Sequence, residues 1–459
     1  MFAVPGICLL LIFLLARPQE LFPELQKVPF LHLSAALAAF GYIIDVRLHR
    51  LQPLAANTLP WALGFFAWTL VSVAGNVPEQ LPHMVLEMSV MFVLYGTLAH
   101  GIQRLRTFQF VAGVLAVTCV FIGAVCFHQG LSDKQCVGGQ DRDGEILGRP
   151  DGRHCEIHEQ CYGPDAEPGL EYRCEKVGLF GTYSVDNRVR YRGDLHDPNE
   201  VALALATGGI GLLIGFALRK RRPSSQILVG LGVALLLATI ILTRSRGGLV
   251  CALLVPGVYV IRRYGWSAII PLATLALPTV VLGLRGGARA DLSTMNRYEA
   301  WAAGLRMFEH SPIYGVGPRR FVDHFWLTAH NSYVLTLSEL GIVGMFLFVG
   351  ILYLCVKTLV VGLRELRTIP GTAAAQVWGM ALMSALAGIV FQINTLSFAY
   401  HSVLWLFVGL VGAWHSAVRH HRPDLVVRMK LRDIAIVAVL VFGYAFVALP
   451  LFLKYKGLL

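Results

Sequence analysis

Residues 107–126 read TFQFVAGVLAVTCVFIGAVC and contain no charged side chain. An α-helix rises 1.5 Å per residue, so about 20 such residues cross the roughly 30 Å hydrocarbon core of a bilayer. A soluble α/β protein would interrupt the stretch with turn residues every ~5–8 residues. The stretch therefore predicts a membrane-spanning helix.

Blocks of the same kind recur along the whole chain of 459 residues, which is 56% hydrophobic and 15% charged. Soluble domains carry about 25% charged residues. The first block lacks the basic start and the cleavage site of a signal peptide, so we expect it to be retained as a span. The pattern predicts an all-α, polytopic helical membrane protein with 13 spans, or 12 because the second and eighth blocks are short. The blocks lie at about 2–16, 30–45, 59–75, 82–99, 107–126, 198–218, 226–243, 247–262, 266–284, 332–357, 373–392, 399–418 and 433–453.

The basic residues behind the net charge of +11 are spread through the connections between blocks. A nucleic-acid-binding protein would gather them on one face, which argues against that class. Lys and Arg favour cytoplasmic connections. The cluster Arg219-Lys220-Arg221-Arg222 is therefore placed in the cytoplasm, and alternation adds five further connections to that side. These carry Arg47, Arg50, Arg104, Arg106, Arg262, Arg263, Lys357, Arg364, Arg367, Arg419, Arg422, Arg428, Lys430 and Arg432.

This orientation places two long segments outside a bacterial inner (cytoplasmic) membrane. Residues 1–126 are then N-terminal transmembrane helices, and 127–197 are a periplasmic loop with a Cys-rich insertion at about 131–176. Residues 198–284 are central transmembrane helices, and 285–330 are a periplasmic loop with an amphipathic helix. Residues 331–459 are C-terminal transmembrane helices.

Four of the nine cysteines lie in the first long loop, at Cys136, Cys155, Cys161 and Cys174. Cysteines in a polar segment outside the cytoplasm favour disulfides. A zinc site is the alternative, although it usually shows tighter pairs such as C-x2-C. We expect two disulfides, and three pairings remain open.

Three groups of polar residues fall on the outer side, where ionisable groups at a membrane are functional candidates. The first holds Arg188, Arg190 and Arg192 on alternate residues, so that an extended chain would line them on one face. His196-Asp197-Pro198-Asn199-Glu200 follows, with Asp197 as a helix cap and Pro198 at the first helical position. A capped helix behind a solvated basic loop is the plain alternative.

The second group is Thr243-Arg244-Ser245-Arg246-Gly247-Gly248, between two apolar blocks. Arg244 and Arg246 stand on the side that should be poor in arginine. They are either an interfacial pair or an anion site at a tight turn beside a helix N-terminus. The planar fork of arginine suits a diphosphate, because it binds two oxygens at once.

The third group runs from Asn296 to Asn331. Its first part is spaced as one face of an amphipathic helix on the membrane surface, with Arg297, Trp301, Leu305 and Phe308 on that face. Pro312-Ile313-Tyr314-Gly315-Val316-Gly317 then predicts a turn, and His330-Asn331 stands at the start of the next apolar block. His330 is either a helix-start residue or a functional imidazole.

Together the groups suggest several arginines and one histidine at a lipid-accessible site. Arginines would neutralise the charge that develops on a polyprenyl diphosphate leaving group. An imidazole with an ordinary pKa near 6.5 can accept a proton from a sugar hydroxyl. Because no convincing outer Asp-x-Asp marks a metal site, we expect metal-independent chemistry without a cofactor.

The same residues resemble the signature of the O-antigen ligase and polymerase superfamily, over about 188–350. The resemblance rests on Arg297-x-x-x-Trp301, Pro312–Gly317, Phe321, His330-Asn331-Ser332-Tyr333, Leu340-Gly341-Ile342-Val343-Gly344, Ser245-Arg246-Gly247-Gly248 and Arg190-x-Arg192-Gly193-x-x-x-Asp197-Pro198-Asn199. The Cys-rich insertion and the thirteenth span depart from the family pattern.

The resemblance implies an inverting, metal-independent glycosyltransferase whose donor is an undecaprenyl-diphosphate-linked glycan. It implies His330 as the base and Arg246, with Arg192 or Arg190, as diphosphate ligands. Arg297 matches a further motif arginine, and Arg244, Asn331, Asn199 and Trp301 would support the site. The acceptor would be the lipid A core for a ligase, or another lipid-linked glycan for a polymerase.

Two other classes remain open. A small-anion transporter should place charges near mid-membrane, whereas the blocks hold few apart from Glu87 and Glu339. A non-catalytic assembly or sensor protein built around the disulfide loop would tolerate the loss of His330 and Arg246.

Overall fold

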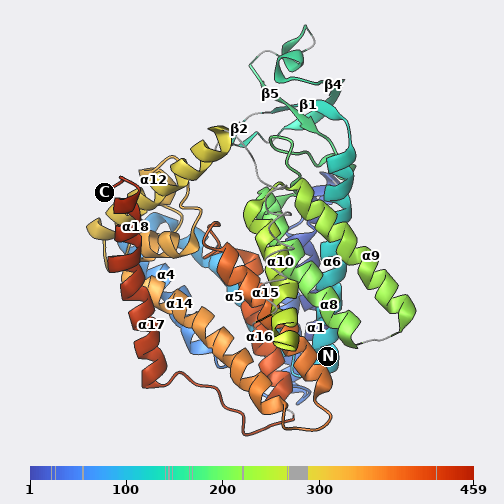
Figure 1. Cartoon of the computed structure of the whole chain (residues 1–459), viewed down its shortest axis with the longest axis vertical. Helices are drawn as coiled ribbons and strands as arrows, with labels where there is room; N and C mark the ends of the chain where they lie inside the picture. The colour runs from blue at the N-terminus through green and yellow to red at the C-terminus, as the bar shows by residue number, and fades with distance from the viewer. Residues whose placement is uncertain are drawn as a thin grey trace.

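Helices that run side by side make up most of the chain, and a small β lobe stands at one end of them (Figure 1). The computed structural model describes residues 1–459 except 22, 26, 54–55, 140, 143–144, 147, 165, 168, 220–221, 266, 268–287 and 420. The N-terminal helices are α1 (Ala3–Leu15), α2 (Pro18–Leu21), α3 (Phe30–Arg47), α4 (Leu59–Asn76), α5 (Leu81–Gly101) and α6 (Leu105–Leu131).

The second half of the chain supplies the remaining helices. The central ones are α7 (Pro198–Ala204), a π-helical stretch (Leu205–Gly211), α8 (Leu212–Arg219), α9 (Pro223–Leu242) and α10 (Arg246–Tyr264). The later ones are α12 (Ala288–His310), α13 (Phe321–His324), α14 (Ser332–Leu366), α15 (Ala373–Gln392), α16 (Ser402–Arg419), α17 (Leu431–Gly443), a second π-helical stretch (Tyr444–Ala448) and α18 (Leu449–Tyr455).

Ten helices in the described part of the chain are long and apolar enough to cross a membrane. They correspond to ten of the thirteen predicted blocks. The first block forms the shorter helix α1, and the eighth forms α10, which carries Arg262 and Arg263 and is not among the ten. The ninth block, about 266–284, lies outside the described residues apart from Ser267. The chain is a multi-pass membrane protein of the all-α class.

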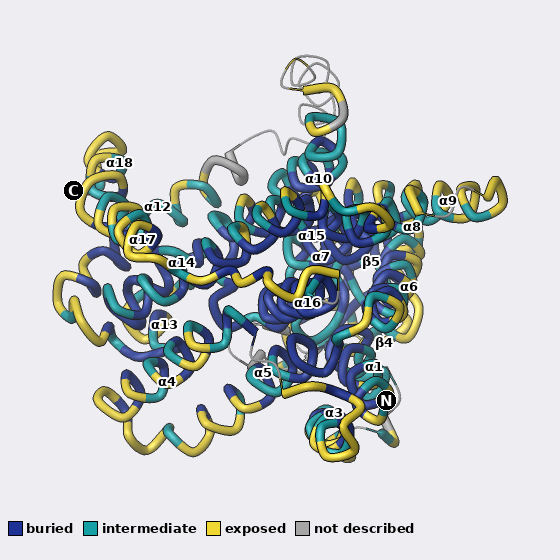
Figure 2. Tube along the Cα trace, turned by 90° about the horizontal axis from the view of Figure 1, so that it is seen from below, coloured by how far each residue is buried: buried dark blue, intermediate teal, exposed yellow. Residues whose placement is uncertain are grey.

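The helices differ widely in how much of their surface is buried inside the bundle. Helix α16 is central, with 94% of its apolar window buried, whereas the window of α9 is 17% buried. Figure 2 shows the same contrast, with α16 dark in the middle and α9 exposed at the edge. An exposed helix that is apolar all round is suited to a lipid environment.

The basic helix ends and the β lobe lie at opposite ends of the bundle. Helices α8 and α14 end, and α9 and α17 begin, away from the strands (Figure 1). Arg219 closes α8, Arg222 precedes α9 and Lys430 precedes α17. This separation is the one that the distribution of Lys and Arg predicts.

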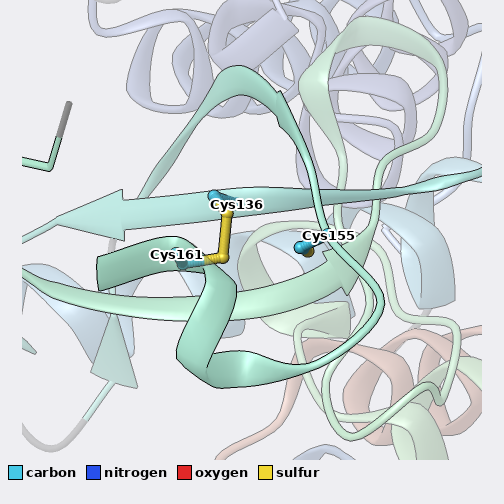
Figure 3. Close-up of side chains that lie close together, drawn as sticks. All are labelled: Cys136, Cys155 and Cys161. Carbon is cyan, nitrogen blue, oxygen red and sulfur yellow. A yellow bond between two sulfur atoms is a disulfide. The ribbon is translucent and has the colours of Figure 1, made fainter. Parts of the chain in front are cut away.

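The β lobe follows α6 directly. Strands β1 (Lys134–Gly139), β4 (Arg149–His154) and β5 (Glu171–Lys176) form an antiparallel sheet in the order β4-β1-β5, and β2 (Asp141–Arg142) pairs with β3 (Glu145–Ile146). Two disulfides, Cys136–Cys161 and Cys155–Cys174, cross-link segments within the lobe. Figure 3 shows the first bond beside Cys155.

The sulfur atoms of Cys136, Cys155 and Cys161 lie within 4.8 Å of one another. Each of them is bonded in a disulfide. A zinc ligand must be a thiolate. The sulfur cluster is therefore the core of the lobe, packed with Tyr172, rather than a metal site.

Helix α12 forms where the sequence predicts an amphipathic helix, but protein covers its apolar face. Leu305 and Phe308 are each 3% exposed. Trp301 lies 5.6 Å from Phe452 and Phe308 lies 5.7 Å from Phe446, centroid to centroid. The expected face packs on the C-terminal helices and on α14, because a neighbouring helix offers better contacts than a headgroup layer.

Candidate active site

A cavity of about 1090 Å³ lies beside the loop that follows β5. Its walls come from the α1–α2 turn, the starts of α3, α5 and α7, the segment from Arg319 to His330, the second turn of α14 and the loop before α16. The lining mixes large apolar side chains, such as Met91, Phe321 and Trp326, with polar ones. Such a mixture in a concave site is typical of ligand pockets.

His330 lines this cavity in a strained conformation. Its φ is +44°, in the left-handed region that a non-glycine residue adopts at a cost of about 1–2 kcal/mol. The surrounding contacts hold it there. The His330 N–H donates to Ser397 Oγ at 3.0 Å, and Trp301 Nε1 donates to the neighbouring carbonyl of Ala329 at 2.9 Å. Strain that is maintained in this way is common at functional sites.

The next residue begins α14. Asn331 Oδ1 accepts the N–H groups of Tyr333 and Val334, at 3.0 and 3.2 Å, so Asn331 is the N-cap. The carbonyl of Ile393 and the hydroxyl of Ser332 join this helix start to the turn after α15. The backbone turn at His330 thus directs the imidazole toward the cavity while the helix starts behind it.

Three features set the charge state of His330. Burial and the Arg297 guanidinium lower the pKa of the imidazole below its ordinary value of 6.5, and Asp197 acts in the opposite direction. Among the described residues, no hydrogen bond to the His330 imidazole is present. The ring is therefore neutral near pH 7, with nitrogen available to accept a proton.

The start of α7 borders the same cavity as His330. Asp197 accepts the N–H of Asn199 at 2.6 Å and Glu200 accepts the N–H of Asp197 at 3.2 Å, which makes the predicted helix cap a capping box. Asp197 and Glu200 also line the cavity. The same geometry therefore allows these residues both to cap α7 and to face the cavity.

The arginine turn packs directly on this region. Ser245 Oγ accepts the N–H of Gly248 at 3.0 Å, and α10 begins at Arg246. A Cβ at Gly248 would stand 2.3 Å from that of Ala202, so only glycine allows α10 to approach α7 this closely. Arg244 is exposed, with φ +50°.

Arg188 links the first two predicted groups. Its Nε donates to the carbonyl of Thr243 at 2.9 Å, and its Nη2 donates to Asn199 Oδ1 at 3.1 Å. The loop before α7 and the turn before α10 are thereby held as one surface. Sequence spacing could not predict this contact, because it joins residues that are far apart in the chain.

Arg190 and Arg192 alternate with buried core residues, as an extended segment requires, because Val189 and Tyr191 are 1% and 3% exposed. Their guanidiniums meet backbone carbonyls. Arg190 Nε donates to Tyr183 at 3.3 Å, and Arg192 donates to Glu20 and Phe180 at 2.8 and 2.6 Å. Neither residue is among the described residues that line the cavity.

Of the other predicted residues, Arg297 lies near His330, and Trp301 and Asn331 hold the segment around it. Arg246, Arg244 and Asn199 stand on the adjoining α7–α10 surface. His330 is the member of the predicted set that lines the cavity within the described part of the chain.

Sequence reasoning passed over a second polar region of the same cavity. It holds Glu87, Arg319, Glu339 and Tyr400. Arg319 pairs with Glu87, and the N–H of Phe321 donates to Glu339 Oε1 at 3.1 Å. The signal was present, because Glu87 and Glu339 are carboxylates inside apolar blocks.

A third polar cluster closes the wall near α1. Asp194 accepts from Arg17 and from Ser402, each at 2.5 Å. His401 Nδ1 accepts the N–H of Val403 at 3.1 Å, so its Nε2 carries the proton and donates to the carbonyl of Asp194 at 2.7 Å. Burial raises the pKa of Asp194, but His401 and Arg17 outweigh it, and the net pKa is lowered. This carboxylate is engaged by protein groups.

The matched family model agrees with this geometry. Residues 231–349 match the model described as O-antigen ligase (Wzy_C). The matched range contains the arginine turn, Arg297, the Pro312–Gly317 turn and the His330 helix start. No match to a curated protein is significant. This central segment of the chain is therefore similar to the O-antigen ligase family, whose members are glycosyltransferase-like ligases and polymerases.

Proposed function

We propose that this protein transfers a glycan from undecaprenyl diphosphate to an acceptor at the periplasmic face of the bacterial inner membrane. In the ligase form of the reaction, the acceptor is the lipid A core of lipopolysaccharide. The observation that carries the proposal is His330, which lines the cavity in a strained backbone conformation, with the charges of Asp197 and Arg297 acting on its imidazole.

The reaction assigned to this geometry is a single inverting displacement. His330 accepts the proton of the acceptor hydroxyl as that oxygen attacks the anomeric carbon of the donor sugar. The bond between this carbon and the diphosphate oxygen breaks, and undecaprenyl diphosphate leaves with the electron pair. Asp197 stabilises the imidazolium that forms, since an opposite charge favours the protonated ring.

Arginines neutralise the leaving diphosphate in this proposal. Arg297 is near His330, and Arg246 stands at the N-terminus of α10, where the helix dipole also favours an anion. The arginine fork binds two phosphate oxygens in one plane. Arginines at these two positions support metal-independent chemistry.

A deletion strain tests the function. Its surface glycan should lose the long chains, lipid-linked glycan should accumulate, and wild type should restore the product where His330→Ala does not. Unchanged glycans in the deletion strain, or full complementation by His330→Ala, would overturn the proposal and favour transport or an assembly role.

The same experiment separates ligase from polymerase. A ligase leaves long lipid-linked chains when it is lost, because polymerisation continues upstream. A polymerase leaves single lipid-linked repeat units. We propose the ligase, and an accumulated species of one repeat unit would assign the polymerase reaction to this site instead.

A further inference from the structure

A second cavity, of about 480 Å³, lies at the opposite end of the bundle from the β lobe. Helix α6 starts beside it, after Arg104, and runs to the lobe (Figure 1). Helix α3 connects the two cavities, because Leu31 and His32 near its start line the active-site cavity, whereas His49 and Arg50 beyond its end line the second one. The 18 residues of α3 rise about 27 Å, which is close to the thickness of the hydrocarbon core. The second cavity is therefore no part of the proposed reaction site.

Three arginines from three separate connections line this second cavity. Arg50 follows α3, Arg104 precedes α6 and Arg419 ends α16. The described residues of the lining include no carboxylate, and none of the three guanidiniums forms an ion pair within the described chain. The preference of Lys and Arg for one side of a membrane accounts for basic connections at this end, but it does not require them to line one cavity. Positive charge concentrated in a concave site favours an anion.

Two features of the lining are costly without a ligand. Arg419 Nε is buried and has no hydrogen-bond partner among the described residues, which costs about 1–3 kcal/mol. His49 has φ +55°, in the left-handed region, and such backbone strain is common where a ligand is held. The acidic residue of α3, Asp45, lies outside the lining and accepts the N–H of Ala3 at 3.0 Å. It therefore leaves the cavity open to another anion.

Bonds within the protein hold the walls of this cavity. Gln103 Nε2 donates to the carbonyl of Gln52 at 2.6 Å, and Gln103 Oε1 accepts the N–H of Gln52 at 3.0 Å. Ser416 Oγ donates to the carbonyl of Ala99 at 3.4 Å. These bonds join the connection after α3 to the end of α5, and α5 to α16. The cavity is thus formed by the fold, and its arginines rather than its backbone are available to a ligand.

The surroundings of the cavity favour a lipid over a free anion. Leu33, Leu37 and Phe40 are exposed apolar side chains of α3, and Leu48, which precedes the lining residue His49, is 53% exposed. In a membrane, an exposed apolar helix face meets acyl chains. The cavity therefore lies at the polar end of a lipid-facing helix, and basic pockets between membrane helices suit anionic headgroups.

We propose that this second cavity binds the phosphate of an anionic phospholipid, with Arg50, Arg104 and Arg419 as its ligands. A guanidinium binds two phosphate oxygens at once, and the phosphate would give Arg419 Nε its missing partner. The acyl chains would lie on the exposed face of α3. A free phosphate offers the same oxygens without the chains, so the test compares the two sources. Glycan transfer has no part in this proposal, and binding alone decides it.

The Tm of purified full-length protein, freed of lipid in a neutral detergent, provides the first test. The probes are phosphatidylglycerol, phosphatidylcholine and inorganic phosphate. Phosphatidylglycerol should raise the Tm most, because a ligand stabilises the folded state that binds it, whereas the choline cation of phosphatidylcholine meets arginines. An equal rise with phosphatidylcholine would overturn the proposal. A rise with inorganic phosphate as large as that with phosphatidylglycerol would also overturn it, and would assign the cavity to a free anion.

Substitutions locate the lipid. Arg104→Gln and Arg419→Gln should each weaken phosphatidylglycerol binding about fivefold in a calorimetric titration. Arg47→Gln and Arg106→Gln are matched controls, because they remove the same charge from the same connections at exposed residues outside the lining, and they should bind as wild type does. Losses as large in the controls would mean that general surface charge attracts the lipid, and would overturn the proposal.

The variant Arg104→Gln also guards against a loss of binding that comes from misfolding. The Arg104 side chain is exposed and makes no hydrogen bond or ion pair within the described chain, so the Tm of the lipid-free variant should equal that of wild type. Unchanged phosphatidylglycerol affinity in this folded variant would exclude Arg104 as a ligand and overturn the three-arginine site.

Discussion

Gly341 lies against Ile313 so closely that a Cβ on Gly341 would stand 2.1 Å from the Ile313 carbonyl oxygen. Helix α14 is broken at this point, where Gly341 has φ +66°. The Pro312–Gly317 turn fills the break, since the N–H groups of Val316 and Gly317 donate to Ser338 and Glu339, both at 3.0 Å. The N–H groups of the turn thus bond to the last carbonyls of the part of α14 that precedes Gly341.

Gly341→Ala should therefore destabilise the folded protein. The left-handed backbone and the contact with Ile313 together should cost at least about 1–3 kcal/mol. The measurement is the Tm of purified protein. Gly96→Ala is the control, because a Cβ at Gly96 meets nothing within 4 Å and alanine favours a helix. Equal Tm values for the two variants would show that the close contact between Gly341 and Ile313 does not require glycine.

His330→Ala should abolish transfer, by a factor of about 10²–10⁴ for a lost general base, while the protein stays in the membrane. His330→Asn distinguishes the loss of the base from a change in backbone conformation, because asparagine tolerates the left-handed conformation and cannot act as the base. It should be equally inactive with an unchanged Tm. The control is His324→Ala, on exposed α13 nearby. Activity in His330→Asn near that of wild type would remove His330 from catalysis.

The pH profile of transfer should report the charges around His330. A base acts only when unprotonated, and burial with Arg297 lowers the pKa of His330 to about 4, so wild-type kcat/KM should hold well below pH 6.5 and fall only as the pH approaches that pKa. Asp197→Asn removes the charge that raises this pKa and should move the acid limb to lower pH, with the cap retained because asparagine also caps helices. An acid limb that moves to higher pH in that variant would contradict the assignment.

Arg246→Lys should severely impair transfer, because lysine keeps the charge and loses the two-oxygen fork. Arg192→Lys is the informative comparison. The Arg192 guanidinium bonds to the carbonyls of Glu20 and Phe180, so this change should act mainly on Tm. Transfer rates per folded molecule distinguish the two. A larger loss of kcat in Arg192→Lys than in Arg246→Lys would move the diphosphate site to Arg192.

Mass spectrometry without reduction should recover the bonded pairs Cys136–Cys161 and Cys155–Cys174. These four residues should resist thiol labelling of the unfolded protein until a reductant is added, whereas Cys119 and Cys251 should label at once on unfolding, because they are buried free thiols. Immediate labelling of all nine cysteines on unfolding would exclude the disulfides.

Much of the fold could be predicted because each helix is specified by residues that are neighbours in the sequence. A span requires only a run of apolar residues of membrane length, and ten predicted blocks appear as helices of that kind in the described chain. Caps are equally local, and Asp197 at α7 and Asn331 at α14 stand where the sequence placed helix starts. The predicted face of α12 is also real, but its partner is protein, which a periodicity cannot reveal.

By itself, the sequence determined the spans, the separation of basic ends from the long loops, and the motif residues, because these depend on composition and on spacing within one segment. Only the tertiary structure decided which motif residues meet. It joined Arg188 to Thr243 and Asn199, engaged Arg190 and Arg192 with backbone carbonyls, and set Glu339 and Tyr400 in the wall of the cavity that holds His330. Such contacts arise between segments far apart in the chain, and packing between helices, rather than local preference, determines them.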